Sequence, residues 1–212
     1  MDVKKAAAET KDYIVSIRRE FHRHPELSLQ EFRTAQRIEE ELDKFGIPHT
    51  RVGETGVLGT LKGAKDNGKV LVLRADIDAL AFTEQTGYPF ASRNPGVMHA
   101  CGHDGHTAAL LGAAKYCAAH RDQLCGTIKF VFQPAEEGPA PGGAKYIVES
   151  GVLDDVEFMI GGHQSTYASV GQVLVKSGIA CAGGHAFKLT LTGVGTHAIS
   201  PQDGSDVIST AM

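Results

Sequence analysis

The sequence predicts an α/β fold built on an open sheet that is covered on both faces. The first observation is the run at 70–75, which is apolar apart from Arg74 and therefore typical of a central strand buried on both sides. The second is that further apolar runs, at 127–132 and 158–162, alternate with segments of helical pattern. The third is that all three runs end in acidic or imidazole side chains, and open α/β sheets carry their chemistry at the carboxyl ends of their strands.

The remaining elements follow from local patterns. Apolar residues recur at three- and four-residue steps near the N-terminus, and a capping-box pattern at Ser28 opens a second helix that Gly46 ends. A loop with no clear period, residues 79–100, separates the central strand from a buried helix rich in Ala and Leu. Helices are predicted at about 3–22, from Ser28 to Gly46, at 105–119 and at 142–150. Two further strands are predicted at 48–52 and 56–62.

Composition excludes several classes of protein. With 212 residues and 42% apolar residues, the chain can bury the core of one substantial domain or slightly more. A net charge of −4 gives no electrostatic case for binding nucleic acid or an anionic membrane. No apolar run is typical of a signal peptide or a transmembrane helix, and four cysteines form no disulfide-rich pattern. A cytoplasmic protein is expected.

Residues 98–106 contain a thiol, three imidazoles and a carboxylate. Cys101 and His103 are one residue apart, so both can face the same space where the chain is extended. Thiolate and imidazole are ligands that zinc and its neighbours prefer, and Asp104 is expected to cap the helix that follows. The alternative at this point is a metal-free cysteine hydrolase, with Cys101 as nucleophile and His103 or His106 as base.

The ends of the three apolar runs supply the rest of the predicted site. Asp76 and Asp78 follow the first run, Glu136 and Glu137 the second, and His163 the third. Adjacent glutamates are costly to desolvate unless each has a partner or a task. One of them could bind a metal while the other handles a proton. Together with the cluster at 98–106, these endings predict a metal-dependent catalytic site.

The character of the sequence changes near its C-terminal end. Residues 186–192 alternate strictly between apolar and polar, which is typical of a half-exposed antiparallel strand. We therefore expect a catalytic domain over 1–180 and the start of a second domain over 181–212. The last segment, 206–212, begins a helix and stops after about two turns, so the chain is expected to be truncated.

The sequence resembles the M20 metallopeptidases, and within them the amidohydrolase branch. That branch contains hippurate hydrolases, N-acyl-amino-acid deacylases and hydrolases of indole-acetic-acid conjugates. The matching stretches are residues 18–27, 73–80, 98–107 and 132–138 and the strand that ends at His163. Among these, Cys-Gly-His-Asp at 101–104 and Pro-Ala-Glu-Glu-Gly at 134–138 are the most specific.

This resemblance implies a mixed, largely parallel sheet with helices on both faces, as in zinc exopeptidases, and the start of an inserted α+β domain that mediates dimerisation. It implies two divalent metal ions, zinc or manganese, with cobalt or nickel as further candidates. By position, Cys101, His103, Glu137 and His163 match the family's metal ligands. A further histidine ligand of the family would lie beyond residue 212.

Three other residues match functional positions of the family. Glu136 matches the general base, and Asp78 matches the acid that supports the metal centre. His197 matches a histidine of the inserted domain that reaches the site of the neighbouring subunit in a homodimer. The implied substrate is a small N-acyl amino acid or peptide-like molecule. The remaining alternative is an inactive fragment that only binds metal or mediates dimerisation.

Overall fold

The computed structural model describes residues 3–180, 182–183 and 187–212. The chain divides into two compact units, with the boundary between Thr166 and Tyr167. The first unit holds a sheet with its covering helices, and the second consists mainly of irregular chain with two short helical turns. No helix of the described residues combines the length and the apolar character that crossing a membrane requires.

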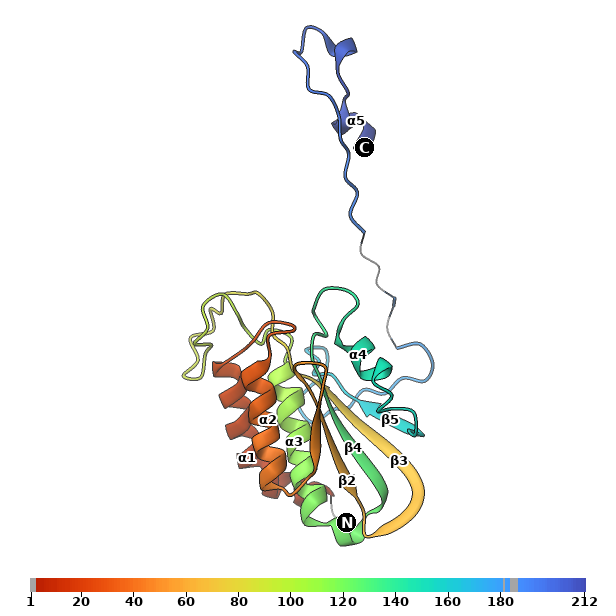
Figure 1. Ribbon diagram of the computed structural model, residues 1–212. Helices are drawn as coiled ribbons and strands as arrows, with labels where there is room; N and C mark the ends of the chain where they lie inside the picture. The colour runs from red at the N-terminus through yellow and green to blue at the C-terminus, as the bar shows by residue number, and fades with distance from the viewer. Residues whose placement is uncertain (1–2, 181, 184–186) are drawn as a thin grey trace. The chain divides into compact units, whose positions relative to one another are not determined.

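The sheet of the first unit is mixed, as predicted. Its five strands in the described chain lie in the order β1-β2-β4-β3-β5. The pairs β1–β2 and β2–β4 are antiparallel, whereas β4, β3 and β5 run parallel. The carboxyl ends of these three parallel strands therefore lie at one edge (Figure 1). The strands are β1 (His49–Val52), β2 (Gly56–Lys62), β3 (Lys65–Asp76), β4 (Cys125–Gln133) and β5 (Phe158–Gly161).

Helices cover both faces of this sheet. Three helices pack on one face, where Leu111 and Phe130 are fully buried in the larger core (Figure 1). The fourth helix packs on the other face, where Ile147 and Val131 belong to a smaller core. Burial on both sides explains why the central strands read as continuous apolar runs. The helices are α1 (Val3–Arg23), α2 (Phe32–Lys44) and α3 (His103–Ala119) on the first face, and α4 (Gly143–Glu149) on the second.

Two helix starts differ from the predictions. Ser28 does not cap α2, which begins at Phe32; its hydroxyl donates instead to Asp78 at 2.6 Å. Asp104 lies inside the first turn of α3, because Gly102 takes the N-cap position with a left-handed φ of 92°. Glycine adopts that conformation without the steric cost that a side chain would bring, and the acid of Asp104 still lies favourably near the positive end of the helix.

The second unit is described by itself. Its short helices are η2 (Pro201–Asp203) and α5 (Val207–Ala211), and the carboxylate of Asp206 caps α5 by accepting from two main-chain N–H groups. The strand predicted at 186–192 is not formed over 187–192, and residue 186 lies outside the described residues. A strand needs a hydrogen-bonded neighbour, and no strand of the described chain pairs with this segment. The predicted domain boundary falls at Cys181, which also lies outside the described residues.

Candidate metal centre

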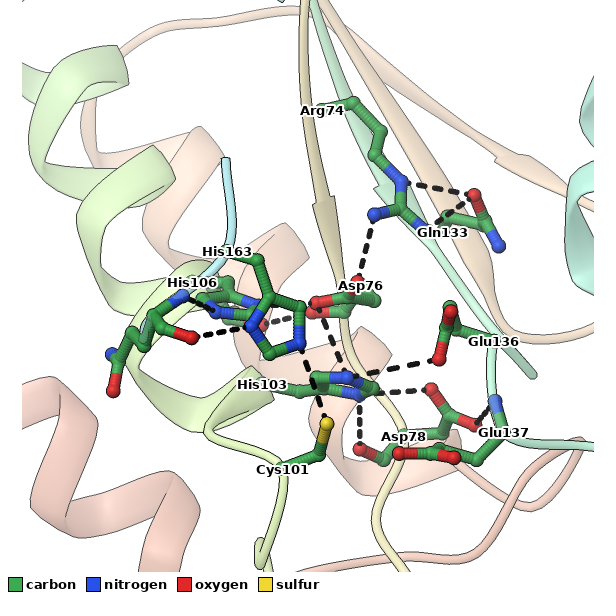
Figure 2. Close-up of polar contacts among 12 residues, drawn as sticks. Arg74, Asp76, Asp78, Cys101, His103, His106, Gln133, Glu136, Glu137 and His163 are labelled. Carbon is green, nitrogen blue, oxygen red and sulfur yellow. Dashed lines mark hydrogen bonds and ion pairs between the residues drawn. The ribbon is translucent and has the colours of Figure 1, made fainter. Parts of the chain in front are cut away.

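Polar side chains converge at the carboxyl ends of the parallel strands. Asp76 is the last residue of β3, Glu136 and Glu137 follow β4, and His163 follows β5. The N-terminal end of α3 brings His103 to the same place (Figure 2). The topology therefore gathers residues that are far apart in sequence, as the endings of the three apolar runs predicted.

His103 is the central side chain of this group and is 1% exposed. Its Nδ1 lies 2.9 Å from the main-chain oxygen of Asp78 and 3.2 Å from Oδ1 of the same residue. Both atoms are acceptors, so Nδ1 carries the proton. Burial disfavours the imidazolium, but the bond to Asp78 and the charge of Asp76 outweigh burial and raise the pKa of His103.

The other ring nitrogen of His103 marks the place for a cation. Nε2 is buried and has no hydrogen-bond partner among the described residues. It lies 3.7 Å from Oδ1 of Asp76 and 3.9 Å from Oε2 of Glu136. A buried polar atom without a partner requires an explanation, and a bound ion is one of the few available. An imidazole nitrogen facing carboxylates fits a transition metal.

Three groups of ligand-type atoms share His103, and two of them contain the predicted ligands. The atoms of Cys101, His103 and His163 lie within 4.8 Å of one another, and so do those of His103, Glu136 and Glu137. Sγ of Cys101 is 3.3 Å from Nε2 of His163 (Figure 2). Because one ring nitrogen ligates one cation, these groups describe adjoining donors around Nε2 of His103. The described residues thus bring all four predicted ligands together.

Cys101 is poorly suited to act as a free nucleophile. Burial, together with the neighbouring carboxylates of Glu137, Glu136 and Asp76, raises the pKa of its thiol to about 12. A reactive cysteine needs the opposite surroundings, with a lowered pKa. A bound cation reverses this effect, because metal ligation deprotonates a thiol. These surroundings favour a metal ligand over the cysteine-hydrolase alternative.

Asp78 connects the parts of the site. Its Oδ2 accepts from the hydroxyl of Ser28 at 2.6 Å and from the main-chain N–H of Glu137 at 2.9 Å, while Oδ1 faces His103. Burial would raise the pKa of Asp78, but these hydrogen bonds lower it overall. An ionised carboxylate that orients a histidine is a common partner of metal-binding imidazoles. This placement fits the supporting role predicted for Asp78.

The two glutamates follow a turn with strained backbone geometry. Ala135 has a φ of 49°, in the left-handed region that residues with side chains seldom adopt. Its main-chain N–H donates to the buried carboxylate of Glu31 at 2.8 Å. Glu136 and Glu137 are both exposed, so neither is held by the core. Their direction depends on the backbone between Ala135 and the Glu137 N–H.

His197 lies in the second unit and is exposed. Its Nδ1 accepts from the main-chain N–H of Ile199 at 3.2 Å, and its carbonyl accepts from Ser200 at 2.9 Å. These contacts are those of a local turn. The participation of His197 in the metal centre of a partner subunit stays a prediction.

Two buried histidines have partners that the sequence did not indicate. His22 places Nδ1 2.8 Å from Asp104 and Nε2 3.2 Å from Glu84. His106 places Nδ1 2.6 Å from Asp76. A spacing of three residues puts His106 on the same face of α3 as His103, so it points toward the end of β3 where Asp76 lies. No local pattern indicates the partners of His22.

Comparison with known proteins places this geometry in a family. The IAA-amino acid hydrolase ILR1-like 5 of Arabidopsis thaliana is 44% identical over 201 residues, which are 94% of this chain and 45% of that protein. The N-acyl-L-amino acid amidohydrolase of Geobacillus stearothermophilus is 43% identical over 209 residues, covering 98% and 56%. The chain therefore spans about half the length of the curated relatives it matches.

A solved structure and a family model agree with these relatives. The crystal structure of a dinuclear metal-binding peptidase from the M20 family of Bacillus subtilis matches with 46% identity and a TM-score of 0.69. That match covers 73% of this chain and 43% of the other. The model of Peptidase family M20/M25/M40 matches residues 72–207, a range that includes the ends of β3, β4 and β5 and the start of α3. Since this range is more than half of the sequence and carries the whole candidate metal centre, the chain belongs to Peptidase family M20/M25/M40.

Proposed function

We propose that the protein is a metal-dependent amidohydrolase that cleaves the amide bond of N-acyl amino acids. The observation that carries this proposal is the unpartnered, buried Nε2 of His103, which faces carboxylates at the carboxyl edge of the sheet. The relatives named above support the substrate class, since their names specify N-acyl amino acids and an IAA–amino acid conjugate. Hippurate-like molecules belong to the same class.

In this proposal Cys101, His103, Glu137 and His163 hold two divalent cations, of zinc or manganese. Cobalt and nickel accept the same thiolate and imidazole ligands. The bound cations would lower the pKa of water toward neutrality and polarise the amide carbonyl. Asp78 keeps the ring of His103 oriented, because it accepts a hydrogen bond from the Nδ1–H group.

Glu136 acts as the general base. It removes a proton from the attacking water and delivers it to the departing amine, which yields a carboxylic acid and an amino acid. Its exposed carboxylate lies 3.9 Å from Nε2 of His103, so it can move protons beside the centre. The carboxylate of Glu137 differs, because it lies beside the thiol of Cys101, another proposed ligand, and adds to the effect of burial in raising the pKa of that thiol.

The second unit has a proposed role at a shared site. Residues 181–212 would begin an inserted dimerisation domain, and residues 1–180 would form the N-terminal part of the catalytic domain. His197 of one subunit would donate a hydrogen bond to the developing oxyanion in its partner, a contribution of about 3 kcal/mol. We propose that the protein works as a cytoplasmic homodimer.

Metal removal and a thiol substitution test the proposal. The complete gene product, loaded with zinc or manganese, should hydrolyse N-acetyl amino acids or hippurate and should lose this activity in a chelator. Cys101→Ser should lower metal content sharply, because a neutral hydroxyl replaces a soft thiolate. Unchanged metal content by elemental analysis would contradict the ligand assignment. Activity that persists in a chelator but is lost when thiols are alkylated would favour a cysteine hydrolase. Metal binding without turnover of any N-acyl amino acid would instead favour a non-catalytic module.

A further inference from the structure

A chain of hydrogen bonds connects the end of β3 to the ring of His163. Asp76 faces Nδ1 of His106 at 2.6 Å, and Nε2 of His106 accepts from the main-chain N–H of Gln164 at 2.9 Å. The main-chain oxygen of Gln164 lies 2.6 Å from Nδ1 of His163. We call these four residues the histidine link (Figure 2 labels all but Gln164).

The donors and acceptors of the histidine link fix both tautomers. A main-chain N–H can only donate, so Nε2 of His106 carries no proton and Nδ1 donates to Asp76. A carbonyl oxygen can only accept, so Nδ1 of His163 carries a proton. The unprotonated Nε2 of His163 then faces Sγ of Cys101 at 3.3 Å. This is the nitrogen that the proposed metal centre requires.

Asp76 and His106, at one end of the histidine link, are buried, whereas His163, at the other end, is exposed. Asp76 is 1% and His106 8% exposed, and Asp76 also accepts from Arg74 at 2.7 Å. His163 is an exposed residue on a segment without regular structure. An exposed side chain of this kind samples several rotamers unless a bond holds it. The link supplies that restraint.

The side chain of Gln164 adds a second contact with α3. An added Cβ at Gly105 would overlap Nε2 of Gln164 and lie 2.9 Å from its Cδ, and an added Cβ at Gly102 would lie 3.1 Å from its Oε1. The absence of side chains at these two glycines therefore leaves the space that Gln164 occupies. This packing is independent of the bond between His106 and the Gln164 N–H.

We propose that His106 and Gly105 are positioning residues, which hold the segment 163–164 against α3 so that Nε2 of His163 is presented to the metal centre. This role rests on the proposed function, because it gives His163 its task as a ligand. A ligand restrained before metal binding loses less conformational entropy when the metal binds. Partners that orient a ligand typically change metal affinity by about 10- to 100-fold.

Substitution of His106 tests the bond to Gln164. His106→Ala should weaken the binding of one zinc ion by about 10- to 100-fold, measured by competition with a chelator of known affinity. His106→Gln should recover part of the loss, because its amide oxygen can accept from the Gln164 N–H. Thr107→Val is the matched control. It removes a buried bond of 2.9 Å from the same turn of α3 to the main chain of Asp76 without removing a bond to the segment 163–164.

Gly105→Ala separates this role from a purely structural one. Alanine favours a helix more than glycine does, and Gly105 has no left-handed φ, so the thermal midpoint should stay equal or rise. The displaced Gln164 side chain should nevertheless weaken zinc binding about 10-fold. The double variant Gly105→Ala/Gln164→Ala should lose no more zinc affinity than Gln164→Ala alone, because both changes remove the same contact.

A measurement on the zinc-free chain gives a readout without metal. Nitrogen chemical shifts of the imidazole rings should show His106 and His163 in the Nδ1-protonated tautomer, and Gly105→Ala should lose this preference at His163. Parent-like zinc affinity in both His106→Ala and Gly105→Ala, or an equal loss in Thr107→Val, would overturn the positioning role alone. A parent chain that binds no zinc would overturn the proposed function together with it.

Discussion

The carboxylate of Glu31 accepts a hydrogen bond of 2.8 Å from the main-chain N–H of Ala135, across 104 residues of sequence. Its other oxygen accepts from the hydroxyl of Thr55 at 2.7 Å, and the residue is completely buried. Ala135 is the residue with left-handed backbone directly before Glu136. Glu31 therefore holds the turn that presents both glutamates of the candidate centre.

The buried Glu31 predicts a pH dependence of stability. Burial raises the pKa of Glu31 above its ordinary value of 4.5, against the lowering effect of its hydrogen bonds. Its contribution is therefore fully present below pH 4.5 and is lost as the pH rises through the raised value. The stability of the parent relative to Glu31→Gln should fall by about 1.4 kcal/mol for each unit by which the pKa is raised. Urea unfolding at pH 4, 6 and 8 measures this difference, and a constant difference would contradict the prediction.

The adjacent glutamates are expected to respond differently to the same substitution. Glu136→Gln should keep its metal and lose turnover by about 10²- to 10⁴-fold, because an amide fills the same space but takes up no proton. Glu137→Gln should lose metal and turnover together. Elemental analysis and hydrolysis assays on the complete gene product measure both properties. Identical behaviour of the two variants would show that the division between base and ligand is wrong.

His22 is expected to stabilise the fold as an imidazolium. Its bond to Asp104 comes first among the effects that raise its pKa above 6.5, and the contact with Glu84 adds to it, whereas burial acts in the opposite direction. Its contribution should be fully present below pH 6.5 and lost as the pH rises through the raised value. His22→Leu removes this partner from Asp104 and Glu84 and should destabilise the fold at pH 6, by less than the roughly 3–5 kcal/mol of an unpaired buried charge, because Arg18 still donates to Asp104 at 3.1 Å.

Urea unfolding at pH 6 and pH 9 checks this expectation for His22. The cost of His22→Leu should shrink at pH 9. An equal cost of His22→Leu at both pH values would mean that the imidazole acts through packing rather than charge.

His197 predicts complementation between subunits. In the complete gene product, His197→Ala should keep its metal and its dimer but turn over slowly, by about 10²- to 10³-fold for a lost oxyanion donor. Mixing it with Glu136→Gln should restore activity, because one site of each heterodimer then combines an intact Glu136 with an intact His197. Subunit exchange without recovery of activity would rule out the shared site.

The sequence predicted those features that depend on local patterns. The run at 70–75 lies inside β3, and the Ala- and Leu-rich segment forms α3. Both are covered by neighbouring elements over most of their residues, and such cover leaves a nearly continuous apolar signature. The end of each parallel strand also carries the expected acid or imidazole. These features need only the periodicity of a few residues and the rule that parallel strands end at one edge.

Features that depend on distant partners could not be predicted in this way. The prediction that Ser28 caps α2 is wrong because its hydroxyl bonds to Asp78, 50 residues later. His22 reaches Asp104 across 82 residues, and His106 reaches Asp76 across 30. No periodicity encodes such pairings, since they follow from the packing of α1 and α3 against the sheet. The buried polar network around the candidate centre therefore required the structure.

The proposed ligands come from three separate segments, which meet only when β3, β4 and β5 lie side by side with α3. An unfolded chain cannot assemble such a set, so a cation that binds it would favour the native state alone. At a free concentration 100 times its dissociation constant, each such cation would add about 2.7 kcal/mol to the free energy of unfolding. Metal supply would then govern the lifetime of the protein as well as its chemistry. In a cell depleted of the cation, the metal-free protein would unfold more often and would be degraded before the metal-bound protein.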